Sequence, residues 1–289
     1  MIKKGIILAG GTGSRLFPAT KAVNKQLMLL YDKPVIYYPL SVLMLSGIKD
    51  ILIIVNSGQV NNFRKLLGDG KNFGIKISYL DQNKPTGIPE AFIIGEKFIN
   101  KENVALILGD NFFYGQSLGE NLKNISKKFR TGCNIFLKKV KNPSQFGVAQ
   151  IRKNKIIKII EKPKIKISNE AITGLYLFDK NVSKFCKTLK KSKRGETEIT
   201  DLIKKYKNYR IKFTKLGIGS IWSDTGTVED MHEVSKYIAS IDRIQNFKIA
   251  CLEEIALIKN WISKKKLINN LRKENINNAY SKYLKNIVS

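Results

Sequence analysis

The chain has 289 residues, of which 43% are hydrophobic, enough for one large domain or for a domain with an extension. No apolar run reaches the ~18 residues needed to cross a membrane, and the first apolar stretch runs into a glycine loop, which argues against a signal peptide. Three separated cysteines, Cys133, Cys186 and Cys251, form neither a disulfide framework nor a metal-ligand cluster. We therefore expect a cytoplasmic protein without membrane contact.

The net charge of +29 suits an anionic substrate, because a positive surface attracts anions over a distance. Nucleic-acid binding would require a basic face with interleaved aromatic residues. Only eight of the 52 basic residues are arginines, and the lysines are spread from one end of the chain to the other. This distribution indicates a bias in composition, and we expect no nucleic-acid partner.

The first half of the chain alternates strand and helix patterns, which predicts a Rossmann-like, mostly parallel sheet flanked by helices. The expected strands are residues 4–8, 50–55, 76–80 and 103–108. The expected helices between them are residues 35–45, 59–67 and 89–98. All four strands are apolar and β-branched, as strands buried on both faces are. Ligands of such sheets bind at the carboxyl ends of the strands.

The second half is richer in strands and ends in helices. Strands are expected at residues 134–140, 147–151, 155–161, 171–178 and 211–217. Helical patterns are expected near residues 198–206, from Val228 onward, and in short amphipathic pieces after Phe247. The fold class is therefore α/β, with a β-rich insertion and C-terminal helices.

A glycine-rich loop follows the first expected strand. Its residues are Gly10, Gly11, Thr12, Gly13, Ser14 and Arg15. Such a loop exposes backbone N–H groups to an anion, and Arg15 and Lys25 add a guanidinium fork and an ammonium group. Leu16 stands where a dinucleotide-binding fingerprint needs its third glycine, and no Walker A ending is present. The loop predicts a triphosphate site, with a plain strand-to-helix turn as the alternative.

Two aspartates stand just beyond apolar strands. Asp110 follows the run Leu106–Gly109, and Asp224 lies in a second turn between a strand and a helix. Carboxylates placed in this way are suitable ligands for a Mg²⁺ that also binds phosphate oxygens. Each aspartate alone would more often be a turn residue or a helix cap. Beside a phosphate loop, the metal site is the favoured interpretation.

A further polar set follows in the β-rich part. Glu161 is suited to accept hydrogen bonds from sugar hydroxyls, and Lys162 and Arg194 are suited to hold a phosphate monoester. The alternative for Glu161 and Lys162 is a solvated strand end, and the spacing alone does not decide between them. The only histidine, His232, falls on an expected surface helix, which argues against a histidine triad or a zinc site.

Several motifs occur in an order that is typical of one family. They are GIILAGGTGSRLFP, KQL at 25–27, YDKPVIYYPLSVLMLSGI, LGDN at 108–111, EKP, TGLY, RGETEITD and DTGT. On these motifs the chain resembles the glucose-1-phosphate thymidylyltransferases from residue 4 to about residue 262. Members of that family make dTDP-glucose for deoxysugar pathways such as dTDP-rhamnose synthesis, which supply cell-surface polysaccharides.

The resemblance implies roles for individual residues. The nucleotide would contact Leu8, Gly10, Gly11, Thr12, Gly13, Ser14, Arg15, Lys25, Gln26, Gln82, Pro85, Gly87 and Asp110. Glucose 1-phosphate would contact Gly147, Glu161, Lys162, Ile172, Tyr176, Arg194 and Trp222. Asp110 and Asp224 would hold Mg²⁺, and Arg15, Lys25 and Lys162 would be catalytic.

The resemblance also implies an organisation and a mechanism. A nucleotidyltransferase domain would span residues 1–242, with its nucleotide-binding part at about 1–130 and its sugar-phosphate-binding part at about 131–226. Residues 243–289 would form a helical extension at a subunit contact, in a homotetramer. The sugar phosphate would attack the α-phosphorus of dTTP in line, so that positioning and charge neutralisation carry the catalysis. Alternatives are a uridylyltransferase that uses UTP and a non-catalytic homologue.

The chain departs from the family pattern at a few positions. Ser14 replaces a threonine, Phe146 replaces a tyrosine, and residues 86–90 differ from the usual nucleobase loop. Gln116 replaces a histidine and Ile258 an arginine at the family's feedback site, where a second nucleotide binds. Because an arginine can bind phosphate in a bidentate manner, its loss predicts weakened feedback regulation.

Overall fold

The computed structural model of the protein describes residues 2–289, apart from the side chains of residues 208 and 209. The strands are β1 (Lys4–Ala9), β2 (Leu29–Leu30), β3 (Lys33–Pro34), β4 (Asp50–Asn56), β5 (Lys76–Gln82), β6 (Val104–Leu108), β7 (Phe112–Tyr114), β8 (Cys133–Lys139), β9 (Gly147–Arg152), β10 (Lys155–Glu161), β11 (Glu170–Phe178), β12 (Ile211–Lys215) and β13 (Ile221–Ser223). The α-helices are α1 (Tyr37–Leu45), α2 (Val60–Leu67), α3 (Glu90–Ile94), α4 (Glu96–Ile99), α5 (Leu118–Lys128), α6 (Val182–Cys186), α7 (Ile199–Lys205), α8 (Lys207–Arg210), α9 (Val228–Gln245), α10 (Leu252–Ile258), α11 (Lys264–Glu274) and α12 (Ala279–Asn286).

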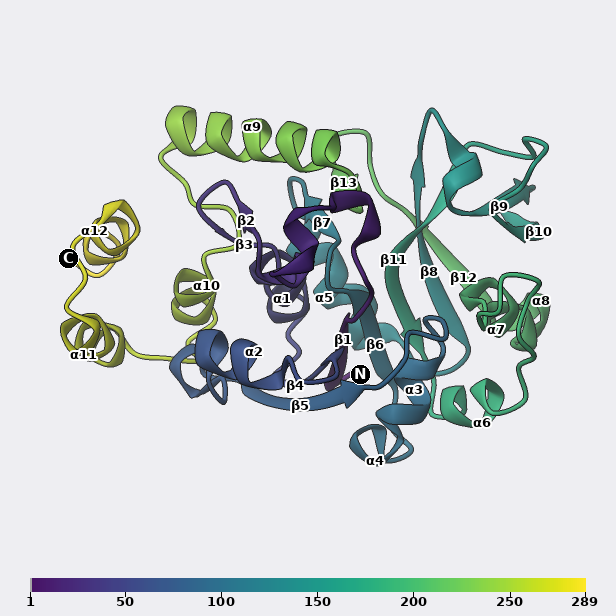
Figure 1. The fold of residues 1–289 in the computed structure, drawn as a ribbon, viewed down its shortest axis with the longest axis horizontal. Helices are drawn as coiled ribbons and strands as arrows, with labels where there is room; N and C mark the ends of the chain where they lie inside the picture. The colour runs from purple at the N-terminus through teal and green to yellow at the C-terminus, as the bar shows by residue number, and fades with distance from the viewer. Residues whose placement is uncertain (1) are drawn as a thin grey trace.

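A nine-stranded sheet forms the centre of the molecule (Figure 1). Its main path runs β10-β9-β11-β6-β1-β4-β5, and β8 pairs with β11 and with β12. β1 is parallel to both β4 and β6, and β4 is parallel to β5. β11 is antiparallel to its neighbours and joins this parallel half to the β-rich part. The α/β class with a largely parallel sheet flanked by helices is therefore confirmed.

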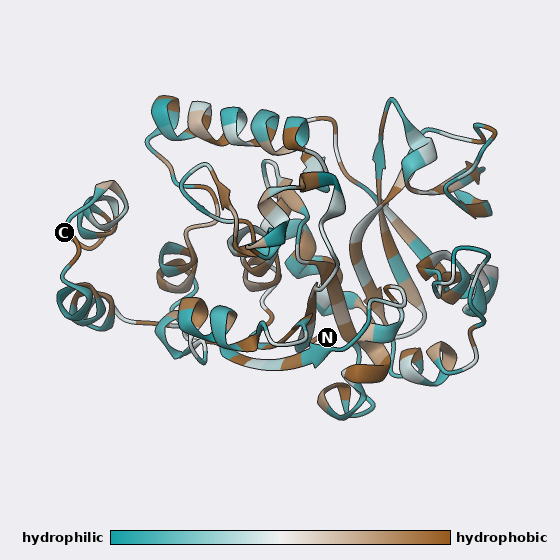
Figure 2. Cartoon of the chain, in the orientation of Figure 1, coloured by the Kyte–Doolittle hydropathy of each residue, from teal (hydrophilic) through white to brown (hydrophobic). Residues whose placement is uncertain are grey.

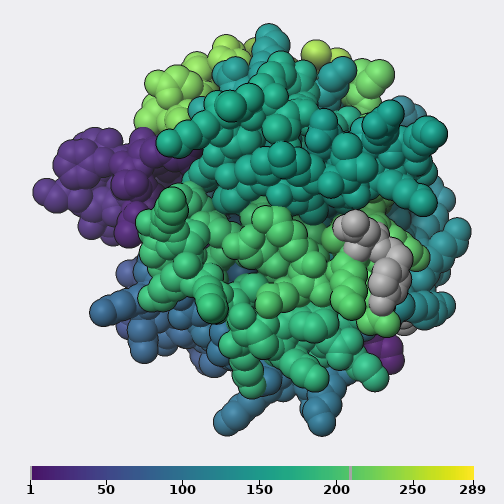
Figure 3. All heavy atoms as spheres, turned by 90° about the vertical axis from the view of Figure 1, so that its right-hand side faces the viewer, coloured from purple at the N-terminus to yellow at the C-terminus, as the bar shows by residue number. Residues whose placement is uncertain are grey.

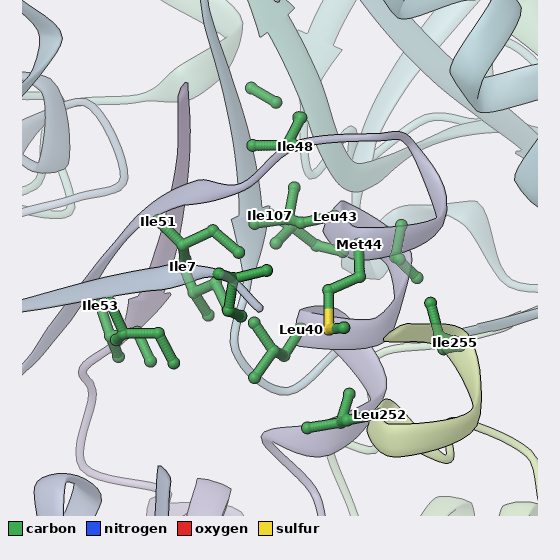
Figure 4. Close-up of a cluster of buried hydrophobic side chains, with 14 of the residues drawn as sticks. Ile7, Leu40, Leu43, Met44, Ile48, Ile51, Ile53, Ile107, Leu252 and Ile255 are labelled. Atoms are coloured by element: carbon green, nitrogen blue, oxygen red, sulfur yellow. The ribbon is translucent and has the colours of Figure 1, made fainter. Parts of the chain in front are cut away.

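Helices cover both faces of the sheet, because the side chains of buried strands point alternately to opposite faces. On one face, as Figure 4 shows, the contacting residues are Ile7, Ile51, Ile53 and Ile107 from the strands, Leu40, Leu43 and Met44 from α1, and Leu252 and Ile255 from α10. Ile6, Leu52 and Leu106 point to the other face, where they pack with residues of α3 and α6. Figure 2 shows hydrophobic residues concentrated on the central strands and hydrophilic residues on outer helices such as α11.

Several features differ from the sequence-based expectation, which did not include the helices α5 and α6 or the short β2–β3 pair. The helix expected at residues 89–98 is broken at Gly95 into α3 and α4. A Cβ at Gly95 would lie 3.1 Å from side-chain atoms of Ile6 and Leu52, so the glycine allows the helix pair to approach the sheet closely. The small antiparallel sheet of β7 and β13 was also not predicted, because strands of three residues have no readable periodicity.

The C-terminal helices begin with α9, which opens on a capping box between Thr227 and Asp230. α10 then packs on α1, while α11 and α12 lie at the end of the molecule opposite β9 and β10 (Figure 1). Within residues 2–289, no helix has the length and apolar character needed to span a membrane.

Candidate functional site

Three adjoining cavities lie at the carboxyl edge of the parallel strands, and Asp110 lines all three. Their volumes are about 250, 210 and 200 Å³. They are called here the sugar cavity, the base cavity and the loop cavity, in that order. Figure 3 shows the N-terminal segment in purple projecting beside the teal and green atoms of the β-rich part. Because a single carboxylate borders all three cavities, ligands in them would come close together there.

The loop cavity is formed by the glycine-rich loop after β1. Gly11 and Gly13 have φ angles of 105° and 59°, which residues with a side chain rarely adopt. Asn56, at the end of β4, holds the loop, because it accepts a hydrogen bond from Gly11 N (2.9 Å) and donates one to Gly11 O (2.7 Å). The loop continues into a 3-10 turn, Ser14–Leu16. Thr12 is exposed and lines none of the three cavities.

Two cations reach the two aspartates. Lys25, only 8% exposed, places its Nζ 2.7 Å from Asp110 Oδ2 and donates to the backbone oxygen of Asp224 at 3.1 Å. Arg15 Nη2 lies 3.5 Å from Asp224 Oδ2. Gly226 makes room for this guanidinium, because a Cβ there would lie 2.6 Å from Nη2. The predicted triphosphate ligands and the predicted metal ligands therefore form one charged cluster.

The two carboxylates are close enough to repel each other. The pKa of Asp224 is raised mainly by burial and next by the charge of Asp110, while Arg15 and Lys25 oppose the rise. A divalent cation would relieve this repulsion, and carboxylates are the oxygen ligands that such hard cations prefer. Among the described residues no group of three or more acidic, histidine or cysteine side chains is placed so that it could hold a metal ion. Two carboxylates suit a cation that takes its other oxygens from phosphate and water.

The base cavity contains two buried glutamines. Gln82 donates from Nε2 to Glu90 Oε2 at 2.8 Å, and the same carboxylate oxygen accepts hydrogen bonds from the backbone and the hydroxyl of Thr86. Since a carboxylate only accepts, this contact turns the amide nitrogen of Gln82 toward Glu90 and leaves its Oε1 beside Gly10. Gln26 is 3% exposed, and its Oε1 is buried without a hydrogen bond to any described residue.

The sugar cavity lies between β9, β10 and β11. Gly147 and Glu161 are opposite each other in the β9–β10 pair. Glu161 Oε2 is buried and has no hydrogen bond of good geometry within the described part of the chain, although the nearby Thr200 hydroxyl acts to lower the pKa of this carboxyl. Its pKa is raised by burial and by the nearby Glu198, against the influence of Arg194 and Lys162. An unsatisfied acceptor beside a glycine suits a ligand that donates hydroxyl hydrogen bonds.

Arg194 is held at the opening of the same cavity. Its Nη2 and Nε donate to the two oxygens of Glu198 at 2.6 and 3.1 Å, and Nη2 also lies 3.8 Å from Glu161 Oε1. Glu198 is 7% exposed. Sequence reasoning did not single out Glu198, although it belongs to the RGETEITD motif. Its function in the structure is to fix the guanidinium in one orientation.

Asn111 is the second residue that sequence reasoning missed. It is 1% exposed, and its Oδ1 accepts from Trp222 Nε1 (2.7 Å) and Gly174 N (3.1 Å). Its Nδ2 donates to Asp110 Oδ1 at 2.9 Å. Asn111 thus connects the wall of the sugar cavity to the carboxylate that borders all three cavities. Its position in the LGDN motif directly after Asp110 was the available signal.

The structure brings almost all of the predicted site residues together. The base and loop cavities are lined by Leu8, Gly10, Gly11, Gly13, Ser14, Arg15, Lys25, Gln26, Gln82, Pro85, Gly87 and Asp110. The sugar cavity is lined by Gly147, Glu161, Lys162, Ile172, Tyr176, Arg194 and Trp222, and also by Asp110 and Asp224. Phe146, which replaces a tyrosine, packs against Trp222 with ring centroids 5.0 Å apart.

Residues 4–241 match the family described as nucleotidyl transferase. The glucose-1-phosphate thymidylyltransferase of Neisseria meningitidis serogroup A is 49% identical over 97% of this chain and 98% of its own. That of Xanthomonas campestris pv. campestris is 44% identical over 98% of this chain and 96% of its own.

Solved structures agree with this match. A Bacillus anthracis structure assigned as a glucose-1-phosphate thymidylyltransferase, with sucrose bound, has a TM-score of 0.74 and 38% identity, and the match covers 81% of this chain and 94% of that one. A UDP-glucose pyrophosphorylase with UDP-glucose has a TM-score of 0.72 and 25% identity, over 83% of this chain and 99% of that one. The chain therefore belongs to the nucleotidyl transferase family. Its curated relatives are glucose-1-phosphate thymidylyltransferases, and the similarity extends over nearly its whole length.

The connecting function of Asn111 can be tested by substitution. Asn111→Ala removes the partner of the partly buried Nε1 of Trp222 and one partner of Asp110 Oδ1, which is expected to lower the free energy of unfolding by about 1–3 kcal/mol. We expect kcat/KM to fall by roughly tenfold or more. Steady-state kinetics and thermal unfolding, measured on the same samples, check both effects.

A matched variant separates stability from positioning. Asn111→Asp keeps the acceptor for Trp222 but sets a second carboxylate beside Asp110, so kcat/KM should fall further than the loss of stability explains. Kinetics of Asn111→Ala that match those of the unmodified enzyme would contradict this function of Asn111.

Proposed function

We propose that the protein transfers a thymidylyl group from dTTP to glucose 1-phosphate and releases pyrophosphate, the first step of dTDP-deoxysugar synthesis. The observation that carries this proposal is the position of Asp110, which borders the loop, base and sugar cavities at once. Two phosphorylated substrates held in these cavities would meet at one charged centre. The similarity to thymidylyltransferases over nearly the full length supports the choice of substrates.

The nucleotide would occupy the base and loop cavities. Gln82 would present its Oε1 to the N3–H of thymine, since its amide nitrogen is already taken by Glu90. The unsatisfied Oε1 of Gln26 is available to the same nucleotide. Arg15 and the glycine loop would hold the triphosphate, and Lys25 would lie at the α-phosphate beside Asp110.

Glucose 1-phosphate would occupy the sugar cavity. The buried Oε2 of Glu161 would accept hydrogen bonds from sugar hydroxyls, and Trp222 would form part of the wall. Lys162 and Arg194 would hold the phosphate from two sides. Arg194 is oriented for this by Glu198, so it loses little freedom when the anion binds.

The chemistry requires positioning and charge neutralisation. The attacking phosphate oxygen is already an anion, so no general base is needed, and His232 lines none of the three cavities. Arg15, Lys25 and Lys162 would offset the charges of the two substrates as they approach. Asp110 and Asp224 would hold Mg²⁺, which, when bound, supplies further positive charge to the phosphate oxygens.

None of the contacts that the structure describes favours either alternative function, a non-catalytic homologue or a uridylyltransferase. A non-catalytic homologue is expected to lack one of Arg15, Lys25, Asp110 or Asp224, and all four are present and converge. UTP differs from dTTP at the base by one methyl group, worth about 1–3 kcal/mol in a fitted pocket, so UTP is expected to be a poorer substrate. We further propose a cytoplasmic homotetramer, with residues 1–242 as the catalytic domain and residues 243–289 at a subunit contact.

The first test is the reaction itself. With Mg²⁺, dTTP and glucose 1-phosphate, the purified protein is expected to release pyrophosphate and form dTDP-glucose, because both anions have charged sites that meet. A panel of nucleotides and sugar phosphates, scored by pyrophosphate release, identifies the preferred pair. EDTA should abolish turnover, and an equal rate without divalent ions would show that Asp110 and Asp224 do not hold a required metal.

The second test separates the two anion sites. Arg15→Ala should raise KM for dTTP, and Lys162→Ala should raise KM for glucose 1-phosphate, because each removes a charge-assisted contact. We expect kcat/KM to fall by roughly one to two decades, from a loss of about 1.5–3 kcal/mol. Lys158→Ala is the control, since Lys158 is exposed on β10, the strand that Lys162 directly follows, and lines none of the three cavities. Unchanged sugar-phosphate kinetics in Lys162→Ala would refute the assignment of Lys162.

The third test concerns feedback inhibition. Ile258 lines an apolar cavity of about 270 Å³ whose lining contains a single cation, Lys248. That lysine is already bound to Asp242 at 2.9 Å and Asp32 at 3.4 Å. Gln116 is not among the lining residues, so this apolar cavity itself offers little positive charge to a nucleotide, although Ile258 also lines a neighbouring cavity that contains lysines. We expect weak inhibition by dTDP-rhamnose that is competitive with dTTP.

An inhibition series at several dTTP concentrations measures this behaviour. Ile258→Arg is expected to restore stronger inhibition, because it supplies a guanidinium at the cavity. Strong inhibition of the unmodified enzyme that saturating dTTP does not relieve would contradict the expectation.

A further inference from the structure

A larger cavity lies outside the active site, between the end of α1, the helix α5 and the segment that follows α10. Its volume is about 460 Å³, larger than any one of the three active-site cavities. Four lysines line it, namely Lys49, Lys123, Lys127 and Lys259, and none of its lining residues is acidic. It is called here the lysine cavity. None of the four lysines lines an active-site cavity or the apolar cavity described above, and of the described residues only Ile258 lines both that apolar cavity and the lysine cavity.

Two of these lysines are held in place by uncharged partners. Lys259 Nζ donates to the backbone oxygen of Leu45 at 2.9 Å. Lys49 Nζ lies 4.7 Å from the ring centroid of Trp261, which also lines the cavity. Both contacts fix the direction of an ammonium group without neutralising its charge. A ligand would therefore meet two cations that are already positioned.

The other two lysines come from a single helix face. Lys123 and Lys127 are four residues apart on α5, a spacing that places their side chains next to each other. Both are exposed, and in the described part of the chain none of the four lysines forms an ion pair with a carboxylate. Like charges at this spacing destabilise a helix, so α5 gains nothing from them in isolation.

The charges of three of these lysines act on one another. The pKa of Lys259 is lowered, first by burial and then by the charges of Lys123 and Lys127. The ammonium groups therefore share one region of space and repel each other in it. The negative charge of an anion bound among them would offset this repulsion, and the anion would accept charge-assisted hydrogen bonds from the ammonium groups.

We propose that the lysine cavity is a binding site for an oligophosphate anion, a group with two or more linked phosphates. Four lysines around one cavity match the three or four negative charges of pyrophosphate or of a triphosphate chain better than the charge of a single phosphate. The same chemistry occurs in inorganic pyrophosphate and in the phosphate tail of a nucleoside triphosphate. Binding there is independent of the proposed reaction, because the two sites have no residue in common.

The site is tested by counting binding events. Titration calorimetry with inorganic tripolyphosphate, at low salt and without divalent ions, is expected to show two equivalents per chain, one in the active site and one in the lysine cavity. Lys123→Gln/Lys127→Gln should weaken the second event by about tenfold or more for each ammonium removed, and so leave one equivalent. The matched control is Lys65→Gln/Lys128→Gln, which removes two exposed lysines that line none of these cavities.

The expected result is two equivalents in the unmodified protein and the control, one in the cavity variant, and an unfolding temperature that is not lowered in either variant. A second equivalent that is weakened by added NaCl also supports the site. Parallel titrations with pyrophosphate and dTTP show which source of the anion the cavity accepts. A single equivalent in the unmodified protein, or two retained in the cavity variant, would overturn the proposal.

Discussion

The repulsion between Asp110 and Asp224 is the constraint around which the active site is organised. Two strand pairings bring the glycine loop, Asp110 and Asp224 to the same point. β1 lies parallel to β6, which sets the glycine loop beside Asp110, and β13 pairs with β7 so that Ser223 is opposite Phe112. Asp224 follows directly after β13 and thereby reaches the same point. Lys25 and Arg15 offset the two negative charges in the structure, and under the proposed function phosphates and a divalent cation would contribute to this neutralisation.

The same constraint explains why the surrounding residues are tied to one another. Asn111 connects Asp110 to Trp222, Glu198 orients Arg194, and Glu90 orients Gln82. Each of these contacts fixes a polar group that faces a cavity, so the site is organised in the absence of ligand. Atoms that lack partners in the described residues, such as Glu161 Oε2 and Gln26 Oε1, then mark where ligand groups would complete the hydrogen bonding.

The sequence was sufficient to predict the parallel strands, the glycine loop and the positions of Asp110 and Asp224 just beyond strand ends. Periodicity and turn residues are local signals, so they can be read without knowing the fold. The family resemblance supplied the residues of the sugar cavity, whose chemistry alone was ambiguous at Glu161 and Lys162. The β7–β13 pair and the three orienting residues Asn111, Glu198 and Glu90 could not be predicted in the same way. Their functions depend on contacts between segments far apart in sequence, such as the hydrogen bond from Trp222 to Asn111.

The central claim is that both substrates are bound together and that the thymidylyl group passes directly between them. This follows from cavities that meet at Asp110 and from a groove whose lining contains no cysteine or histidine among the described residues. The most direct measurement is the configuration at the α-phosphorus of dTDP-glucose made from one diastereomer of dTTP carrying sulfur on that phosphorus. A single in-line displacement predicts inversion. Retention would contradict the account, because it would require a covalent nucleotidyl-enzyme intermediate.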